Sequence, residues 1–135
     1  MYTHDEILAM SEDELNHAIA RVKGAKWWSI HPIDDAPEDA RPVLSGYECM
    51  IQDDKGDLPF LELPDGSGVP NWTRDIGAAY QLEGEITDPM DQLAYMDFLA
   101  TYSEHAETKF TRWNLIHASP KERSRAWLMW KEGRE

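Results

Sequence analysis

Residues 69–80 read VPNWTRDIGAAY, and they mark the point where predicted strands give way to predicted helices along the chain. Thr73 is the candidate N-cap of a helix, because a hydroxyl just before an apolar repeat can accept hydrogen bonds from the first unpaired backbone N–H groups. We expect this helix to run to about Glu85. Its predicted inner side consists of apolar residues at helical spacing: Ile76, Ala79, Tyr80 and Leu82.

Two capping boxes lie near the start of the sequence. Residues 3–6 and 11–14 each place a hydroxyl three residues before a glutamate, which is typical of a helix N-terminus. The short interval between the boxes predicts one brief helix, followed by a longer helix over about 12–23. Gly24 is placed to end that longer helix.

Three stretches before residue 69 predict strands. Residues 26–31 form a short stretch with two tryptophans. Residues 47–51 alternate in polarity with the period of two that a half-buried strand requires. The acidic stretch 53–57 predicts a hairpin turn, with 58–63 as the returning strand. Pro59 favours an edge position for this last strand, because proline has no N–H to donate to a second neighbour.

Helical signals dominate the rest of the chain. Asp88 followed by Pro89 is typical of a helix start. The predicted apolar residues of this helix are Leu93, Met96, Phe98 and Leu99. Residues 109–116 alternate in polarity and predict a further strand. A third capping box at 119–122 predicts a final helix through Trp130, and Gly133 is placed to end it.

The order of these elements is helix, strands, two helices, strand and helix. It predicts an α+β fold with a small antiparallel sheet layered with helices, an αβα sandwich. Since the chain has 135 residues, we expect one domain over 1–135.

Composition excludes several classes of protein. Apolar residues make up 41% of the chain, yet no apolar run approaches the roughly 20 residues of a membrane span. The formal net charge of −13 disfavours direct binding of nucleic acid, which requires a basic surface. One cysteine, Cys49, cannot form an internal disulfide, and we expect it to be buried and inert. The acidic N-terminal stretch is unlike a signal peptide, so we expect a cytoplasmic protein.

The charge is unevenly distributed along the sequence. Residues 1–108 hold 23 acids and 6 bases, whereas residues 109–135 hold 3 acids and 7 bases. The basic C-terminal stretch either docks on the acidic remainder or provides a local site for an anion.

Three patches of the sequence resemble the phage ABA-sandwich domain, a family of small proteins encoded by phages and prophages. Members open with a segment similar to residues 5–10 and a helix similar to 14–24. Residues 69–80 resemble the family's pattern of proline, aromatic, Ser or Thr, any residue, Asp-Ile, any residue and Ala-Ala. Residues 119–126 resemble its closing capped helix. The resemblance implies a phage origin, an αβα layered fold and no established enzymatic activity.

Motifs for catalysis or cofactor binding are absent from the sequence. It has no HExxH or CxxC pattern, no Gly-x-Ser-x-Gly elbow, and no phosphate-binding or dinucleotide-binding glycine motif. We therefore expect a protein that is not an enzyme, with no catalytic residues, no metal site and no cofactor.

Six tryptophans are the most unusual feature of the composition, and four of them lie close to arginines in the sequence. Aromatic faces stack on bases, and guanidinium groups form paired hydrogen bonds with phosphates. The alternatives for these residues are core packing and a subunit interface. The candidate ligand-binding residues are Trp72, Thr73, Arg74, Arg112, Trp113 and Arg123.

Two functions follow as hypotheses. In the first, the protein is a phage-encoded anti-defence protein that sequesters a small anionic, nucleotide-like signal in the cytoplasm of the bacterial host, as a homo-oligomer. In the second, its acidic surface imitates DNA and inhibits a host protein that binds nucleic acid or acts in defence. Neither hypothesis involves a membrane.

Overall fold

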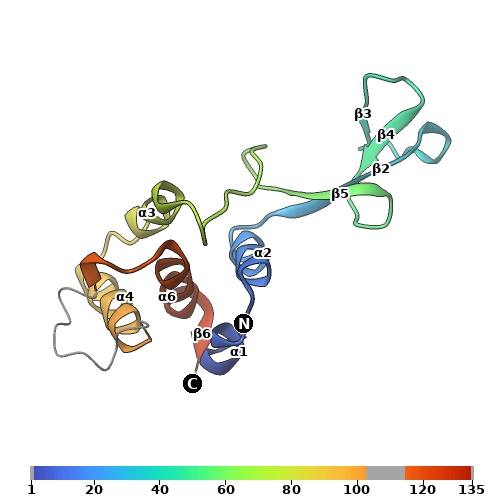
Figure 1. Ribbon diagram of the computed structural model, residues 1–135. Coiled ribbons are helices and arrows are strands. Elements are labelled where there is room, and N and C mark those ends of the chain that lie inside the picture. The colour runs from blue at the N-terminus through green and yellow to red at the C-terminus, as the bar shows by residue number, and fades with distance from the viewer. Residues whose placement is uncertain (1, 103–114, 135) are drawn as a thin grey trace. The chain divides into compact units, whose positions relative to one another are not determined.

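A computed structural model describes residues 2–102 and 115–134, which form two compact units (Figure 1). The helical unit comprises Met1–Ile19 and Pro70–Glu135, and the sheet unit comprises Ala20–Val69. The expected α+β class is confirmed, and so is the small antiparallel sheet. The expectation of one domain over the whole chain stays a prediction.

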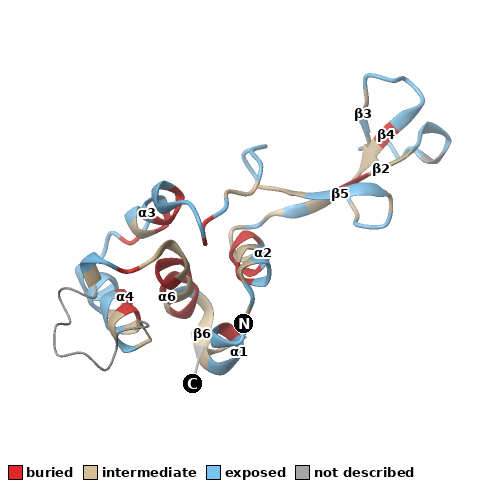
Figure 2. Cartoon of the chain, in the orientation of Figure 1, coloured by how far each residue is buried: buried red, intermediate tan, exposed pale blue. Residues whose placement is uncertain are grey.

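The helical unit is organised around its last helix, α6. Its elements are β1 (Tyr2–Thr3), α1 (His4–Leu8), the first part of α2 (Glu12–Val22), α3 (Ile76–Gly84), α4 (Pro89–Thr101), α6 (Pro120–Glu132) and β6 (Gly133–Arg134). Helices α1, α3 and α4 each contact α6. Figure 2 shows α6 as the most continuously buried helix of the unit, and its residues Ala126, Trp127, Leu128 and Met129 are each at most 2% exposed.

The helix starts follow the capping signals closely. Thr3 accepts from the backbone N–H of Glu6 at the start of α1, and Ser11 accepts from that of Glu14 at the start of α2. Asp88 caps α4, with Pro89 as the first helical residue. At α6 both halves of the predicted capping box form, and the helix ends before Gly133.

Helix α3 starts later than the sequence predicts. Its N-cap is Asp75, whose side chain accepts from the backbone N–H groups of Gly77 and Ala78, so the expectation for Thr73 was wrong. The Thr73 hydroxyl instead donates to the side-chain oxygen of Asn71. The predicted inner side is half right. Ala79 and Leu82 are buried, whereas Ile76 and Tyr80 are exposed.

The sheet unit consists of strands in the order β3-β4-β2-β5, all antiparallel. Its elements are β2 (Lys26–Pro32), the 3₁₀ turn η1 (Ile33–Asp35), β3 (Arg41–Pro42), β4 (Glu48–Ile51) and β5 (Asp57–Glu62). Gly24 precedes β2 with a φ of 86°, in the left-handed conformation that glycine adopts without strain. Strand β5 lies at the edge, as Pro59 predicted, and Cys49 on β4 is buried.

The predicted hairpin between β4 and β5 was wrong. These strands flank β2 on opposite sides, so residues 52–56 cross over from one edge of β2 to the other. The crossing passes close to the backbone of β2: a Cβ atom at Gly56 would lie 2.3 Å from the carbonyl oxygen of Ile30. Glycine allows this approach because it has no side chain.

Two further points concern the ends of the helical unit. The predicted strand over 109–116 lies mostly outside the described residues, and the backbone of Leu115 and Ile116 is helical. Strands β1 and β6 pair in parallel, with Tyr2 opposite Gly133, which the sequence did not suggest. Among the described residues, no helix is long and apolar enough to span a membrane.

Candidate functional site

The turn formed by residues 71–75, hereafter the 71–75 turn, carries three of the six predicted ligand-binding residues. Trp72 is only 2% exposed, and its carbonyl oxygen accepts a hydrogen bond of 2.8 Å from the Ser124 hydroxyl of α6. This indole therefore belongs to the core of the helical unit. It offers no open ring face on which a base could stack.

Thr73 is also buried, and its polar atoms are engaged within the fold. Its backbone N–H donates to the Asn16 side-chain oxygen at 3.2 Å, and its hydroxyl accepts from the Asn16 amide at 3.1 Å. The Asn16 amide also donates to Asn71 at 2.9 Å. This network attaches the 71–75 turn to α2, so the polar groups that we expected to contact an anion serve the fold.

Arg74 is the exposed member of the turn. Its side chain is 74% exposed, and its Nε donates to a carboxylate oxygen of Glu12 at 2.6 Å. The hydrogen bond and charge of Glu12 raise the pKa of Arg74 above its usual value. The negative charge of Glu12 beside this guanidinium opposes the approach of an anion to it.

Arg123 lies elsewhere in the helical unit and is buried. Its guanidinium forms an ion pair with Glu83 of α3, donates to the Ala118 carbonyl oxygen at 3.0 Å and donates to that of Leu115 at 2.9 Å. Burial lowers the pKa of Arg123, but the hydrogen bond and charge of Glu83 outweigh it and leave that pKa raised.

The carboxylate of Glu83 is shared with a second helix. The Tyr95 hydroxyl of α4 donates to it at 2.7 Å, so α3, α4 and α6 meet at one acidic group. Burial, followed by the neighbouring Glu83, raises the pKa of Tyr95. Because its donors face inward to structural partners, Arg123 joins helices rather than facing solvent. Arg112 and Trp113, the other two predicted residues, lie outside the described residues.

A polar cluster in the sheet unit was not anticipated from the sequence. Ser29 and His31 lie two residues apart on β2, and Asp53 lies in the crossing that follows β4. The Asp53 carboxylate accepts from Ser29, lies 2.8 Å from His31 Nε2, and accepts from the Lys55 backbone N–H at 3.2 Å. These bonds, Ser29 first and His31 second, lower the pKa of Asp53 to about 2.

The arrangement of this cluster does not suit nucleophilic catalysis. Ser29 and Asp53 both approach the same imidazole nitrogen of His31, whereas a catalytic triad places the acid and the nucleophile on opposite nitrogens. Ser29 is also fully buried and accepts from the Gly56 backbone N–H at 2.9 Å. The cluster therefore anchors the crossing. The sequence alone does not reveal this cluster, because nothing in the spacing of Ser29 and His31 indicates that Asp53 lies beside them.

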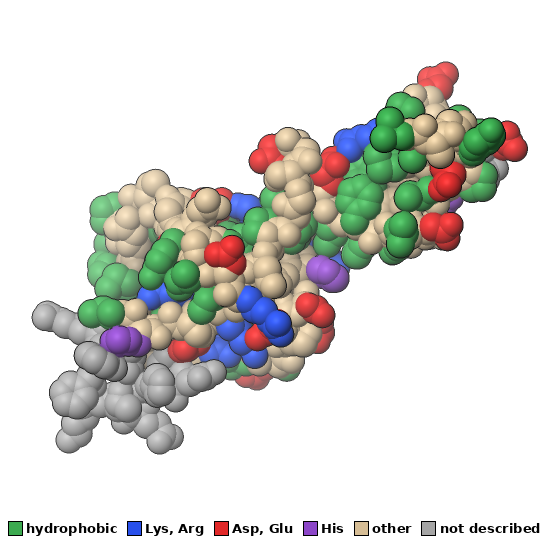
Figure 3. Space-filling model, turned by 45° about the horizontal axis from the view of Figure 1, so that its top comes forward, with side chains coloured by type: hydrophobic (Ala, Val, Ile, Leu, Met, Phe, Trp, Pro, Cys, Tyr) green, Lys and Arg blue, Asp and Glu red, His purple; other side chains and the backbone are tan. Residues whose placement is uncertain are grey.

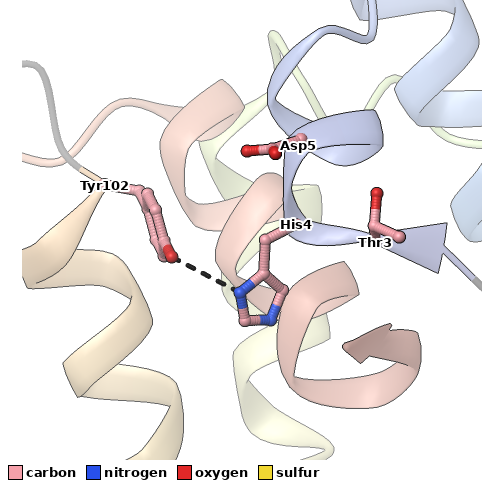
Figure 4. A pocket seen from close by; sticks show the side chains of 4 residues that line it. All are labelled: Thr3, His4, Asp5 and Tyr102. Atoms are coloured by element: carbon pink, nitrogen blue, oxygen red, sulfur yellow. Dashed lines mark hydrogen bonds between the residues drawn. The ribbon is translucent and has the colours of Figure 1, made fainter. Parts of the chain in front are cut away.

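A cavity of about 260 Å³ opens in the helical unit between the start of α1 and the end of α4. It is lined by Thr3, His4, Asp5 and Tyr102 (Figure 4). The Tyr102 hydroxyl and His4 Nδ1 lie 3.4 Å apart, and the imidazole packs edge-on against Tyr102 and Phe98. Among the described residues, this lining includes a carboxylate and no Lys or Arg, which does not suit a phosphate group.

The described residues provide no group of three or more His, Cys, Asp or Glu side chains that could hold a metal ion. The chain matches no family model, and comparisons with curated proteins and with solved structures returned no match either. The resemblance to the phage ABA-sandwich domain, and the origin that it implies, therefore stay predictions.

Proposed function

We propose that this protein is a non-enzymatic binding protein whose acidic surface occupies a basic site on a partner protein. The observation that carries the proposal is the net charge of −13 together with the exposure of the carboxylates. Asp13 and Glu14 on α2 are exposed, as are Asp91 and Asp97 on α4. A surface of this kind attracts a basic partner and accelerates its association.

The sheet unit supports the same proposal. Its exposed acids include Asp34, Glu38 and Asp39 in the segment between β2 and β3. Exposed carboxylates occur in both units, and Figure 3 shows acidic side chains at several separate places on the surface. Spaced negative charge is what a surface that imitates a phosphate backbone would need.

The proposal includes the setting that the family resemblance implies. The protein would be phage-encoded and would act in the cytoplasm of the bacterial host, where it inhibits a host protein that binds nucleic acid or acts in defence. The geometry favours this function over sequestration of a nucleotide-like signal, because Trp72, Thr73 and Arg123 are engaged within the fold.

The test is affinity capture from bacterial lysate on the immobilised protein, followed by reconstitution with the purified partner. We expect a partner with a basic surface, a Kd that weakens by about tenfold or more between roughly 50 and 300 mM NaCl, and direct competition with DNA for that partner. A variant with Asp34, Glu38 and Asp39 changed to amides should bind more weakly, and a complex that is insensitive to salt would contradict the proposal.

Native mass spectrometry with mono-, di- and cyclic nucleotides tests the other hypothesis on the same preparation. A stoichiometric nucleotide adduct on a defined homo-oligomer would favour sequestration and direct attention to Arg74, Arg112 and Trp113. The absence of any adduct, together with a salt-sensitive protein complex, would leave inhibition of a protein as the function.

A further inference from the structure

The exposed side of α4 carries three large apolar side chains. The helix buries Tyr95 and Leu99, and α6 is its main neighbour. On another side of the helix, Met90, Leu93 and Met96 are 72%, 56% and 43% exposed. We call these three residues the methionine face. Their spacing of three residues aligns them as a ridge along the helix surface.

Exposed apolar side chains that line up on one surface mark a site of contact with another protein. In the part of the chain that the structure describes, the methionine face is not covered, and much of α4 is coloured as exposed in Figure 2. Methionine is well suited to a docking surface, because its unbranched side chain adapts to irregular partners.

Along the sequence of α3 and α4, the charge has one sign. Residues 75–102 contain six acids and no Lys, Arg or His. Asp91 and Asp97 are exposed on α4 itself, and neither takes part in the ion pairs described for this structure. The face is therefore an apolar ridge with negative charge beside it.

We propose that the methionine face binds a basic amphipathic helix of the partner protein. This inference rests on the proposed function and specifies how the partner makes contact. Helix α4 has 13 residues, which corresponds to a length of roughly 20 Å, enough to lie along three or four turns of a second helix. Apolar residues of that helix would pack on the ridge, and its lysines and arginines would face Asp91 and Asp97.

Charge distinguishes this occupant from a second copy of the chain. A second copy would bring the same carboxylates to the interface, and like charges at close range oppose association. A helix with flanking bases neutralises Asp91 and Asp97 while it covers the apolar ridge. Charge complementarity therefore favours the basic helix.

The first probe is a labelled peptide of about 18 residues with Leu at helical spacing and Lys on its flanks. The control is a peptide of identical composition in scrambled order, which has the same charge but no apolar face. We expect the ordered peptide to bind the full chain at least about tenfold more tightly in fluorescence anisotropy, which corresponds to about 1.4 kcal/mol.

The matched variants change exposed residues, so the fold is kept. The triple variant Met90→Gln, Leu93→Gln and Met96→Gln should weaken binding of the ordered peptide by about tenfold or more, because the ridge is lost. The control variant Leu44→Gln changes an equally apolar and fully exposed side chain in the sheet unit, and it should bind as the parent does.

Methyl resonances provide a second readout that does not depend on mutation. With ¹³C-methyl methionine, addition of the ordered peptide should shift the signals of Met90 and Met96. The signal of Met129, which is 1% exposed in α6, should stay in place. Uniform small shifts of all methionine signals would overturn the inference.

The outcomes separate this inference from the proposed function. If the scrambled peptide binds as tightly as the ordered one and the triple variant binds both unchanged, the inference fails while a general acidic surface remains supported. If neither peptide binds at low salt, both fail. A parent chain that is a dimer by sedimentation, with a monomeric triple variant, would assign the face to a second copy and overturn the inference.

Discussion

Gly56 is the residue that allows the crossing from β4 to β5. A Cβ atom at this position would lie 2.3 Å from the Ile30 carbonyl oxygen and 2.7 Å from His31 Nε2, so a methyl group must displace backbone as well as side chain. We predict that Gly56→Ala lowers the free energy of unfolding by about 1–3 kcal/mol, the cost typical of overpacking a tight site. Urea denaturation measures the change.

Gly84→Ala is the matched control for this substitution. Gly84 lies in the last turn of α3, and an added Cβ there would meet no atom within 4 Å. We expect it to leave the stability unchanged or to raise it by up to about 1 kcal/mol, because alanine favours helix. Equal stability of Gly56→Ala and the parent would show that the crossing is loosely held.

The carboxylate of Asp53 makes the stability of the sheet unit depend on pH. Its pKa of about 2 in the folded chain lies below the usual value near 3.9, because Ser29 and His31 favour the charged carboxylate. The resulting stabilisation is fully present above about pH 4 and is lost as the pH falls through about 2.

We therefore predict that the stability difference between the parent and Asp53→Asn shrinks as the pH falls from 5 to about 2. Urea unfolding at a series of pH values measures the difference. Asp54→Asn, at the exposed neighbouring position, is the control for the loss of one charge. A difference for Asp53→Asn that stays constant across this range would contradict the role of the carboxylate.

At the scale of elements, two ion pairs provide a direct comparison of burial. Glu83 and Arg123 join α3 to α6 with side chains that are 26% and 9% exposed, whereas Arg74 in the pair with Glu12 is 74% exposed. Removal of one member of a buried pair leaves an uncompensated charge. Exposed pairs contribute little.

We predict that Glu83→Gln lowers the free energy of unfolding by about 3 kcal/mol, whereas Glu12→Gln lowers it by less than about 1 kcal/mol. Chemical denaturation of both variants measures the contrast. The double variant Glu83→Gln with Arg123→Met should recover part of the loss, because it no longer buries an unpaired charge. If the two single variants lower the free energy of unfolding by similar amounts, the charge of Arg123 does not need the Glu83 carboxylate to balance it.

The element scale also shows what the sequence could predict. Helix starts were predictable at Ser119, Ser11 and Asp88, because a helix cap is a local interaction between residues no more than three positions apart. The crossing after β4 was not, because the choice between a hairpin and a crossing depends on which strand lies at the centre of the sheet. The inner sides of α3 and α4 were only partly predictable, since apolar residues occur on more than one side of each helix.

The candidate site was less predictable than the fold. Tryptophan beside arginine is compatible with both a ligand site and a core, and the sequence cannot distinguish them. Trp72 belongs to the core, and its backbone carbonyl accepts a hydrogen bond from Ser124 of α6, 52 positions away along the chain. The methionine face could be recognised only after burial was known, because the sequence of α4 is apolar on the buried side as well.

At the scale of the whole molecule, the two units differ in how much core they contain. In the sheet unit, the buried hydrophobic residues that the structure describes are Ala20, Trp28 and Cys49. The helical unit buries a larger set, from Ile7 and Leu15 to the continuous run 126–129 of α6. Regions with few buried apolar contacts open at a lower free energy cost.

We therefore predict that amides of β4 and β5 exchange with solvent faster than those of α6 by a factor of at least about 100, which corresponds to roughly 2.7 kcal/mol of opening free energy. Hydrogen exchange followed by mass spectrometry measures both units in one experiment. Equal protection of β4 and α6 would show that the units open together. The partner complex should slow exchange in α4 if the methionine face is covered.

The parallel pairing of β1 with β6 gives the chain a nearly circular path. Tyr2 and Gly133 are strand partners, and paired strands lie only about 4.8 Å apart. A linker of a few residues could close the backbone into a ring without disturbing a helix, and the ring could be cut at an exposed turn such as the one at Gly46. Such a circular permutant would keep the same contacts but change the order in which the elements are synthesised. A comparison of its folding with that of the parent would show whether the order or the contacts direct folding.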